Sequence, residues 1–137
     1  IRRRVVRFNP EQEESMARLS RLFRRWGVEE ALIRAGVDIL DLSPSSAERP
    51  GDRAAPFVGL GAPVIAVNNL DIVERALEVL NEKRADLVAV GRGLIADADW
   101  PIKVKEGRLG DIVACTKCDE CYADLRKGGP VGCIQWA

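Results

Sequence analysis

Histidine is absent from this sequence of 137 residues, and its absence removes two large classes of site. Without an imidazole the chain can form neither a Ser-His or Cys-His catalytic pair nor a histidine-bound zinc site. Long apolar runs are also missing, since no stretch approaches the roughly 20 residues that a membrane-spanning helix needs. The first residues are basic and no apolar segment follows them, so the pattern of a signal peptide is missing as well. These absences predict a cytoplasmic protein that uses cysteines, carboxylates, cations, backbone groups or a bound cofactor.

An excess of charge of one sign is lacking too. The 21 Lys and Arg residues are balanced by 21 Asp and Glu residues, so no overall field attracts nucleic acid or an anionic membrane. The run Arg2–Arg4 is a local exception, for which a solvated chain end is the simpler interpretation and a phosphate-contacting arm the alternative. We therefore expect a small-molecule substrate, with neither nucleic acid nor a membrane as a partner.

Cysteine is scarce but concentrated near the end of the sequence. Three of the four cysteines follow one another at three-residue steps, and eleven residues separate them from the fourth: Cys115, Cys118, Cys121 and Cys133. A disulfide framework would spread its cysteines over the fold, and zinc sites more often use two separated Cys-x-x-Cys pairs. The three-plus-one spacing, with a Gly-Gly-Pro turn at 128–130 to bring the chain back, favours a [4Fe–4S] cluster. Zinc and redox-active free thiols remain alternatives.

Short apolar runs alternate with helical patterns, which predicts a parallel β/α fold. We expect four adjacent parallel strands, in this order: 5–8, 37–42, 63–67 and 85–90. The run at 63–67 is apolar on both faces, as buried parallel strands are. Helical spacing predicts a helix that begins at Pro10 and is closed by Gly27, and a further helical piece over 28–35 that ends at Gly36.

A third helix is expected after Asp71, which with Glu74 resembles a capping box. Its apolar stripe comprises Val73, Ala76, Leu77 and Leu80.

Polar and glycine residues follow two of the expected strands. Ligands of parallel β/α folds bind beyond the carboxyl ends of the strands, where backbone N–H groups and a cation can hold a phosphate. Asn68 and Asn69 follow the third strand, and asparagine tolerates the left-handed conformation. Gly91 and Arg92 follow the fourth, where glycine permits close approach and arginine supplies a planar cation. An ordinary turn with a surface arginine is the alternative, but the position after a buried strand favours a phosphate site.

The stretches 63–67 and 85–97, followed by Trp100, Pro101 and Lys103, resemble the last strands of the old yellow enzyme family of NADH:flavin oxidoreductases. The cysteine segment is similar to that of the branch containing 2,4-dienoyl-CoA reductase and trimethylamine dehydrogenase. Members of that branch are FMN barrels that bind a [4Fe–4S] cluster just after the barrel. The resemblance is close over 63–133, fainter over 28–43 and weakest before Gly27.

The resemblance implies a role for each matching residue. Gly91 and Arg92 match the pair that holds the FMN phosphate, and Asn68 and Asn69 occupy the place of phosphate-binding glycines. Arg7 resembles the strand arginine near the N1/O2 edge of the flavin, where a cation stabilises the reduced ring. The four cysteines match the cluster ligands. No residue matches a catalytic acid of the family.

The expected architecture is therefore α/β. Residues 1–110 would form the C-terminal part of a (β/α)8 TIM barrel that binds FMN, and residues 111–137 a [4Fe–4S] cluster-binding segment. A full barrel takes about 250 residues, so we expect a fragment, with a segment missing near 43–63, or a subunit whose barrel is completed by a partner. NAD(P)H and FAD would bind through regions outside this chain.

The expected function is part of an FMN- and [4Fe–4S]-dependent oxidoreductase, of ene-reductase or amine dehydrogenase type, that acts on a small organic substrate. A non-catalytic iron–sulfur electron-transfer or metal-binding module is the alternative.

Overall fold

The computed structural model describes residues 5–8, 27–43 and 51–136. The chain divides into two compact units, one comprising Ile1–Leu70 with Glu74–Ala89 and the other Asp71–Val73 with Val90–Ala137. The boundary expected between residues 110 and 111 lies inside the second unit, and the division into a barrel part and a cluster-binding segment stays a prediction. In the described ranges, no helix combines the length and the apolar character that crossing a membrane requires.

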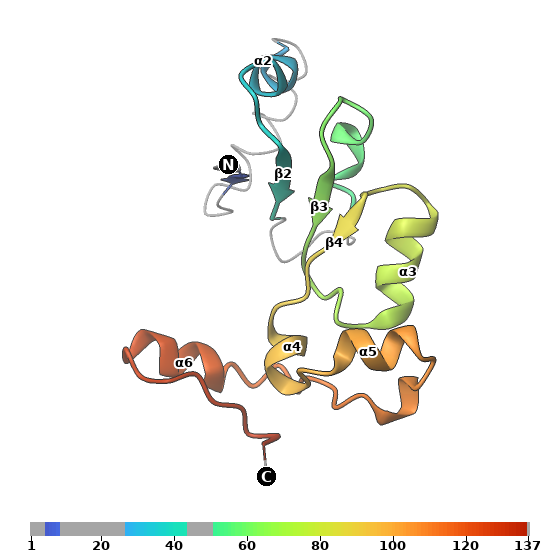
Figure 1. Ribbon diagram of the computed structural model, residues 1–137. Helices are drawn as coiled ribbons and strands as arrows, with labels where there is room; N and C mark the ends of the chain where they lie inside the picture. Colours follow the sequence, from blue (N-terminus) through green and yellow to red (C-terminus); the bar gives the residue numbers. More distant parts are fainter. Residues whose placement is uncertain (1–4, 9–26, 44–50, 137) are drawn as a thin grey trace. The chain divides into compact units, whose positions relative to one another are not determined.

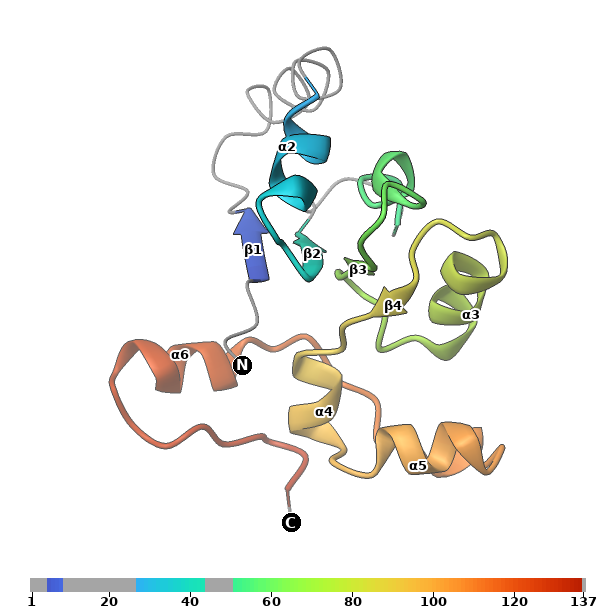
Figure 2. The same cartoon turned by 45° about the horizontal axis from the view of Figure 1, so that its top comes forward.

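The first unit is built on a parallel sheet of four strands. These are β1 (Val5–Phe8), β2 (Ile39–Leu42), β3 (Val64–Ala66) and β4 (Leu87–Val88). Their order in the sheet is β1-β2-β3-β4, which can be followed in Figure 2. Every neighbouring pair is parallel. This confirms the order, the direction and the adjacency predicted from the alternating pattern, although all but β1 are shorter than the predicted runs.

Both faces of β2 are covered. Leu40, Asp41 and Leu42 follow one another along the strand and are only 2%, 6% and 7% exposed. Since successive side chains of a strand point to opposite faces, this burial requires packing on each side of the sheet, which is the usual environment of parallel strands. Val64 of β3 is fully buried next to Leu40 in the register and belongs to the same core.

Helix α2 (Val28–Arg34) precedes β2 and has glycines just beyond its ends. Gly27 has a φ of 61° and Gly36 a φ of 85°. Left-handed backbone of this kind strains residues with a Cβ, so glycine suits both turns. The helical piece predicted over 28–35 is confirmed, and the helix predicted from Pro10 to Trp26 lies outside the described residues.

The described part of the connection from β2 to β3 contains one 3-10 turn, η1 (Ala55–Phe57). Ala54 and Phe57 are buried in the sheet's core, so this short connection itself covers part of the sheet. Arg84 holds the residues just before η1, because the guanidinium of Arg84 contacts the carboxylate of Asp52 at 3.1 Å.

Helix α3 (Val73–Asn81) buries Val73 and Ala76 of the expected stripe, but the stripe differs from the expected one at Leu77. Leu77 was expected on the buried face, but it is 48% exposed. Val79 is fully buried instead, three residues after buried Ala76. The expected assignment of Leu77 is therefore wrong, because the helix is rotated so that the smaller Ala76 and Val79 face the core.

The second unit carries three helices and a 3-10 turn (Figure 1): α4 (Arg92–Ala96), α5 (Trp100–Lys105), η2 (Leu109–Asp111) and α6 (Glu120–Arg126). Pro101 lies in the first turn of α5, where a missing N–H costs nothing. A stretch without regular structure joins η2 to α6, and it contains Cys115 and Cys118. Most of the predicted cofactor residues lie in this unit.

Candidate functional site

The two asparagines after β3 adopt unusual backbone conformations. Asn68 has a φ of 95° and Asn69 a φ of 52°. Positive φ is uncommon outside glycine, and asparagine tolerates it better than most residues. Turns of this kind expose successive backbone N–H groups, which can form concave sites for anions. The backbone at this position is therefore compatible with the phosphate-binding role predicted for it.

Four of the five non-glycine residues with positive φ in the described chain lie in the segments predicted to bind cofactors. Besides Asn68 and Asn69, the non-glycine residues with positive φ are Lys83, Lys117 and Asp119. Lys117 and Asp119 flank Cys118 inside the cysteine run. Such conformations persist only where the surrounding structure holds them, and they cluster at functional sites.

The Gly-Arg-Gly sequence at the start of α4 contains two glycines with different roles. A Cβ added at Gly91 would meet no atom within 4 Å, so the space beside this backbone is open. A Cβ added at Gly93 would lie 2.4 Å from the Cβ of Asp71, a distance that real side chains do not reach. Gly93 is therefore a packing glycine, and of these two glycines Gly91 is the one with open space through which a ligand could approach.

Arg92 and the cysteine run are joined by an ion pair. The guanidinium of Arg92 donates from Nη1 to Oδ1 of Asp119. The side chain of Arg92 is 39% exposed, and that of Asp119 is 61% exposed. The arginine predicted to hold a phosphate thus contacts the residue that follows Cys118.

A second ion pair links the cysteine run to Asp71. Lys117 donates from Nζ to Oδ2 of Asp71, whose side chain is only 12% exposed. The backbone carbonyl of Asp71 accepts a hydrogen bond from the indole of buried Trp100 at 3.0 Å. The carboxylate expected to help cap α3 is thus bonded to Lys117, and α3 begins two residues later, at Val73.

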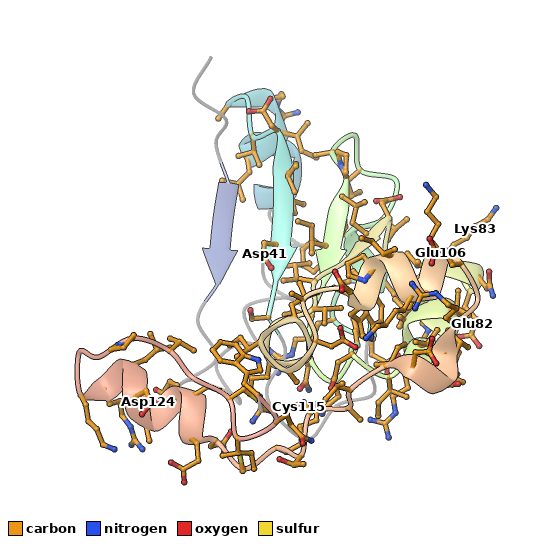
Figure 3. The ribbon with its side chains drawn as sticks, turned by 60° about the horizontal axis from the view of Figure 1, so that its bottom comes forward. Asp41, Glu82, Lys83, Glu106, Cys115 and Asp124 are labelled. Atoms are coloured by element: carbon orange, nitrogen blue, oxygen red, sulfur yellow. The ribbon has the colours of Figure 1, made fainter. Side chains whose placement is uncertain are left out.

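The four cysteines are free thiols. Cys118 is exposed, and the other three are half-buried. Cys115 precedes α6 in the stretch labelled in Figure 3, and its sulfur accepts a hydrogen bond from the backbone N–H of Lys117 at 3.4 Å. Across the described ranges, no three or more Cys, Asp or Glu side chains surround a common point suited to a metal ion.

The chemistry of this donor set nevertheless fits an iron–sulfur cluster. Four thiolates are the usual ligands of a [4Fe–4S] cluster, and hydrogen bonds to sulfur are among the contacts that tune such clusters. The N–H of Lys117 supplies one such bond to Cys115. Of the nearby cations, Lys117 is paired with Asp71, and Arg126 lies over the ring of Tyr122, 5.0 Å from its centroid.

The chain turns back after α6, as the Gly-Gly-Pro pattern predicted. Gly128 has a φ of 71°. The carboxylate of Asp124, labelled on α6 in Figure 3, accepts the N–H of Gly132 at 3.3 Å. Gln135 then donates from its side-chain amide to the carbonyl of Ala114 at 3.0 Å. The first bond ties the segment that carries Cys133 to α6, and the second ties it to Ala114, the residue immediately before Cys115.

Asp97 joins helix α5 to the stretch of chain that leads to the cysteine run. Its buried carboxylate accepts hydrogen bonds from Lys103 Nζ at 2.7 Å and from the backbone N–H groups of Val113 at 2.8 Å and Asp99 at 3.1 Å. The hydrogen bond from Lys103, followed by that from Val113, lowers the pKa of Asp97 below its usual value. Sequence reasoning used Asp97 and Lys103 only as marks of a resemblance and missed this role, although a carboxylate and a lysine flanking a Trp-Pro helix start were visible.

Arg7 lies on β1, where its Cα partner across the sheet is Asp41 of β2. Figure 3 labels Asp41 on that strand. The role predicted for Arg7 next to a flavin stays a prediction.

A comparison with protein families finds that residues 55–111 match the NADH:flavin oxidoreductase / NADH oxidase family. This segment belongs to that family. It includes β3, β4, Asn68, Asn69 and the start of α4, so the family assignment rests on residues that carry the predicted phosphate site as well as on the strands.

Individual relatives agree with the family. The chain is 53% identical to an NADH oxidase of Thermoanaerobacter brockii over 57 residues, which are 42% of this chain and 9% of the relative. It is 35% identical to a dimethylamine dehydrogenase of Hyphomicrobium sp. (strain x) over 74 residues, 53% of this chain and 10% of the relative. The chain thus spans about a tenth of the length of these relatives.

A solved structure extends the likeness to almost the whole chain. The 6-hydroxypseudooxynicotine amine oxidase of Pseudomonas geniculata N1 matches with a TM-score of 0.70 and 25% identity, over 96% of this chain and 21% of that protein. This structural likeness therefore extends beyond the residues of the family match.

Proposed function

We propose that this chain is the C-terminal part of a (β/α)8 barrel in an oxidoreductase that uses FMN and a [4Fe–4S] cluster, of ene-reductase or amine dehydrogenase type. The observation that carries the proposal is the parallel pair β3–β4 within the family match, with positive-φ asparagines after one strand and Gly91-Arg92 after the other. The carboxyl ends of parallel strands meet at one edge of a sheet, which is where such folds bind ligands.

The barrel part of the proposal is supported by the sheet. In the described residues, β1 and β4 form the two edges of the sheet, and a closed barrel would pair both of them with further strands. Leu87 of β4 is 47% exposed, as expected for a strand that additional chain covers. The rest of the barrel would come from a longer chain or from a partner subunit.

FMN would be held by its phosphate and by its ring. The resemblance would assign the phosphate to Asn68 and Asn69 after β3 and to Gly91 and Arg92 after β4, because backbone N–H groups and a guanidinium are groups that bind phosphates. Arg7, near the carboxyl end of β1, would lie next to the ring and favour its reduced, anionic form. When bound, FMN would supply hydride transfer to or from a small organic substrate.

The segment 111–137 would bind the cluster through Cys115, Cys118, Cys121 and Cys133. A cluster of this type exchanges single electrons, which suits a redox partner for the flavin. The dimethylamine dehydrogenase and NADH oxidase among the relatives support an oxidoreductase that takes electrons from small amines or from NADH. NAD(P)H and FAD would bind through regions outside this chain.

Cofactor content of this chain, purified without oxygen together with the rest of its barrel, tests the proposal. We expect one FMN, about four irons and about four inorganic sulfides per chain, with a broad absorbance near 400 nm that dithionite bleaches, as such clusters show in general. A cluster without any affinity for FMN would contradict the flavoenzyme and leave an electron-transfer module. One zinc without sulfide would contradict the cluster.

A further inference from the structure

The cysteine run is held in a strained conformation on both sides of Cys118. Lys117 has a φ of 59° and Asp119 a φ of 62°. Left-handed backbone is unfavourable for residues with a Cβ, so it persists only where other contacts fix it. The contacts that the two side chains make are therefore the first place to look for the cause.

Both side chains form ion pairs with residues far away in the sequence. Lys117 pairs with Asp71, 46 positions earlier, and Asp119 pairs with Arg92, 27 positions earlier. The two pairs have opposite polarity, so Lys117 and Asp119 cannot exchange partners with each other without bringing like charges together. All four residues belong to the second unit.

Asp71 and Arg92, the distant partners in these two ion pairs, are held close to each other by further contacts. The backbone of Asp71 accepts the indole N–H of Trp100 at 3.0 Å, and its Cβ lies so close to Gly93 that a side chain there would collide. Gly93 directly follows Arg92 in α4. The cysteine run is therefore bonded twice to one small assembly, and that assembly includes the arginine proposed to hold the FMN phosphate.

We infer that Asp119 and Lys117 are positioning residues that couple cluster binding to FMN binding; this rests on the proposed function. A guanidinium has five N–H donors in a planar fork. Asp119 uses Nη1 of Arg92, which leaves donors for a phosphate while the fork is held in one orientation. A bound cluster would order the loop and so hold Asp119 where it can accept the hydrogen bond from Arg92. A bound phosphate would hold the guanidinium of Arg92 where it can donate that bond. By thermodynamic linkage each cofactor then raises the affinity of the other by the same factor.

The test measures the dissociation constant of FMN, by flavin fluorescence, in the assembly of this chain with the rest of the barrel, first with its cluster and then after anaerobic removal of the cluster by a chelator. We expect FMN to bind about fivefold more weakly without the cluster, the lower end of coupling between sites. In Asp119→Asn this ratio falls to about one. Asp119→Glu, which keeps the charge, restores part of it.

Glu120→Gln is the matched control. Glu120 is exposed at the start of α6 and makes no ion pair with another described residue, so this variant keeps the ratio of the unchanged chain. The reciprocal measurement is the rate of iron loss to the chelator, which FMN slows in the unchanged chain and in Glu120→Gln but not in Asp119→Asn. Lys117→Met, which removes the bond to Asp71, also lowers the ratio.

The outcomes separate this inference from the proposed function. A chain that binds no FMN or no cluster contradicts the proposed function and the coupling with it. A chain that binds both with a ratio of one, or an Asp119→Asn variant that keeps the ratio of Glu120→Gln, overturns the coupling and leaves the proposed function intact.

Discussion

The carboxylate of Asp97 lies 2.7 Å from the ammonium of Lys103, in a pair whose side chains are only 5% and 15% exposed. The same carboxylate accepts the N–H of Val113. One buried group thus joins the end of α4, the helix α5 and the stretch that leads to Cys115. Because the charged carboxylate makes stronger hydrogen bonds than a neutral one, this arrangement yields a prediction about pH.

Acid should loosen the second unit through Asp97. The pKa of Asp97 is lowered in the folded chain, chiefly by the hydrogen bond from Lys103. A lowered pKa stabilises the fold fully above the carboxyl's ordinary value of about 3.9, and this stabilisation is lost as the pH falls through the folded pKa. Thermal unfolding followed from neutral pH to about pH 3 should show a falling midpoint.

Asp97→Asn should lower that midpoint at neutral pH and flatten its fall in acid, since asparagine carries no charge for Lys103. Glu120→Gln, at an exposed position, is the control and should keep the full dependence on pH. An equal fall in acid for Asp97→Asn would contradict the assignment.

Gly93→Ala should destabilise the second unit. A Cβ at Gly93 would lie 2.4 Å from the Cβ of Asp71, and overpacking of this kind costs about 1–3 kcal/mol of unfolding free energy. Chemical denaturation measures the loss. Gly110→Ala is the matched control, because a Cβ at Gly110 meets no atom within 4 Å; similar stability of the two variants would refute the packing role.

Val79→Ala should lower the unfolding free energy more than Leu77→Ala does, although leucine is the larger residue. Val79 is fully buried and Leu77 is 48% exposed, so removing two methyl groups from Val79 should cost about 2 kcal/mol and truncating Leu77 well under 1 kcal/mol. Urea unfolding of the two variants decides the point. A larger loss for Leu77→Ala would restore the stripe expected from the sequence.

Arg92→Ala should weaken FMN binding by about 1.5–3 kcal/mol, the value of a charge-assisted hydrogen bond. Ultrafiltration with FMN gives the affinity directly. Arg108→Ala is the control, because Arg108 is an exposed arginine that pairs with Glu106 and Asp111. Unchanged affinity in Arg92→Ala would count against the phosphate site.

Serine at Cys133 should make the cluster labile, since three thiolates would remain for four irons. Iron and sulfide content after gel filtration without oxygen measures the loss, and Thr116→Ser, at an exposed position inside the run, serves as the control. Full iron and sulfide in Cys133→Ser would exclude this cysteine as a ligand.

The sequence by itself determined the four parallel strands, their order and the ends of α2. These features depend on local patterns: β-branched and apolar runs favour strands, and glycine at positions of positive φ ends a helix. The positive φ values of Asn68 and Asn69 were likewise foreseeable, because they follow from the side chain itself. The cysteine spacing made the thiols recognisable as a set without any knowledge of the fold.

Only the tertiary structure decided which residues meet. Leu77 and Val79 both fit helical periodicity, and the rotation of α3 against the core selected Val79. The bonds of Lys117 to Asp71 and of Asp119 to Arg92 join residues 46 and 27 positions apart. Local spacing predicts a helix or a turn, but a contact between distant residues depends on the packing of whole elements, which no short window of sequence contains.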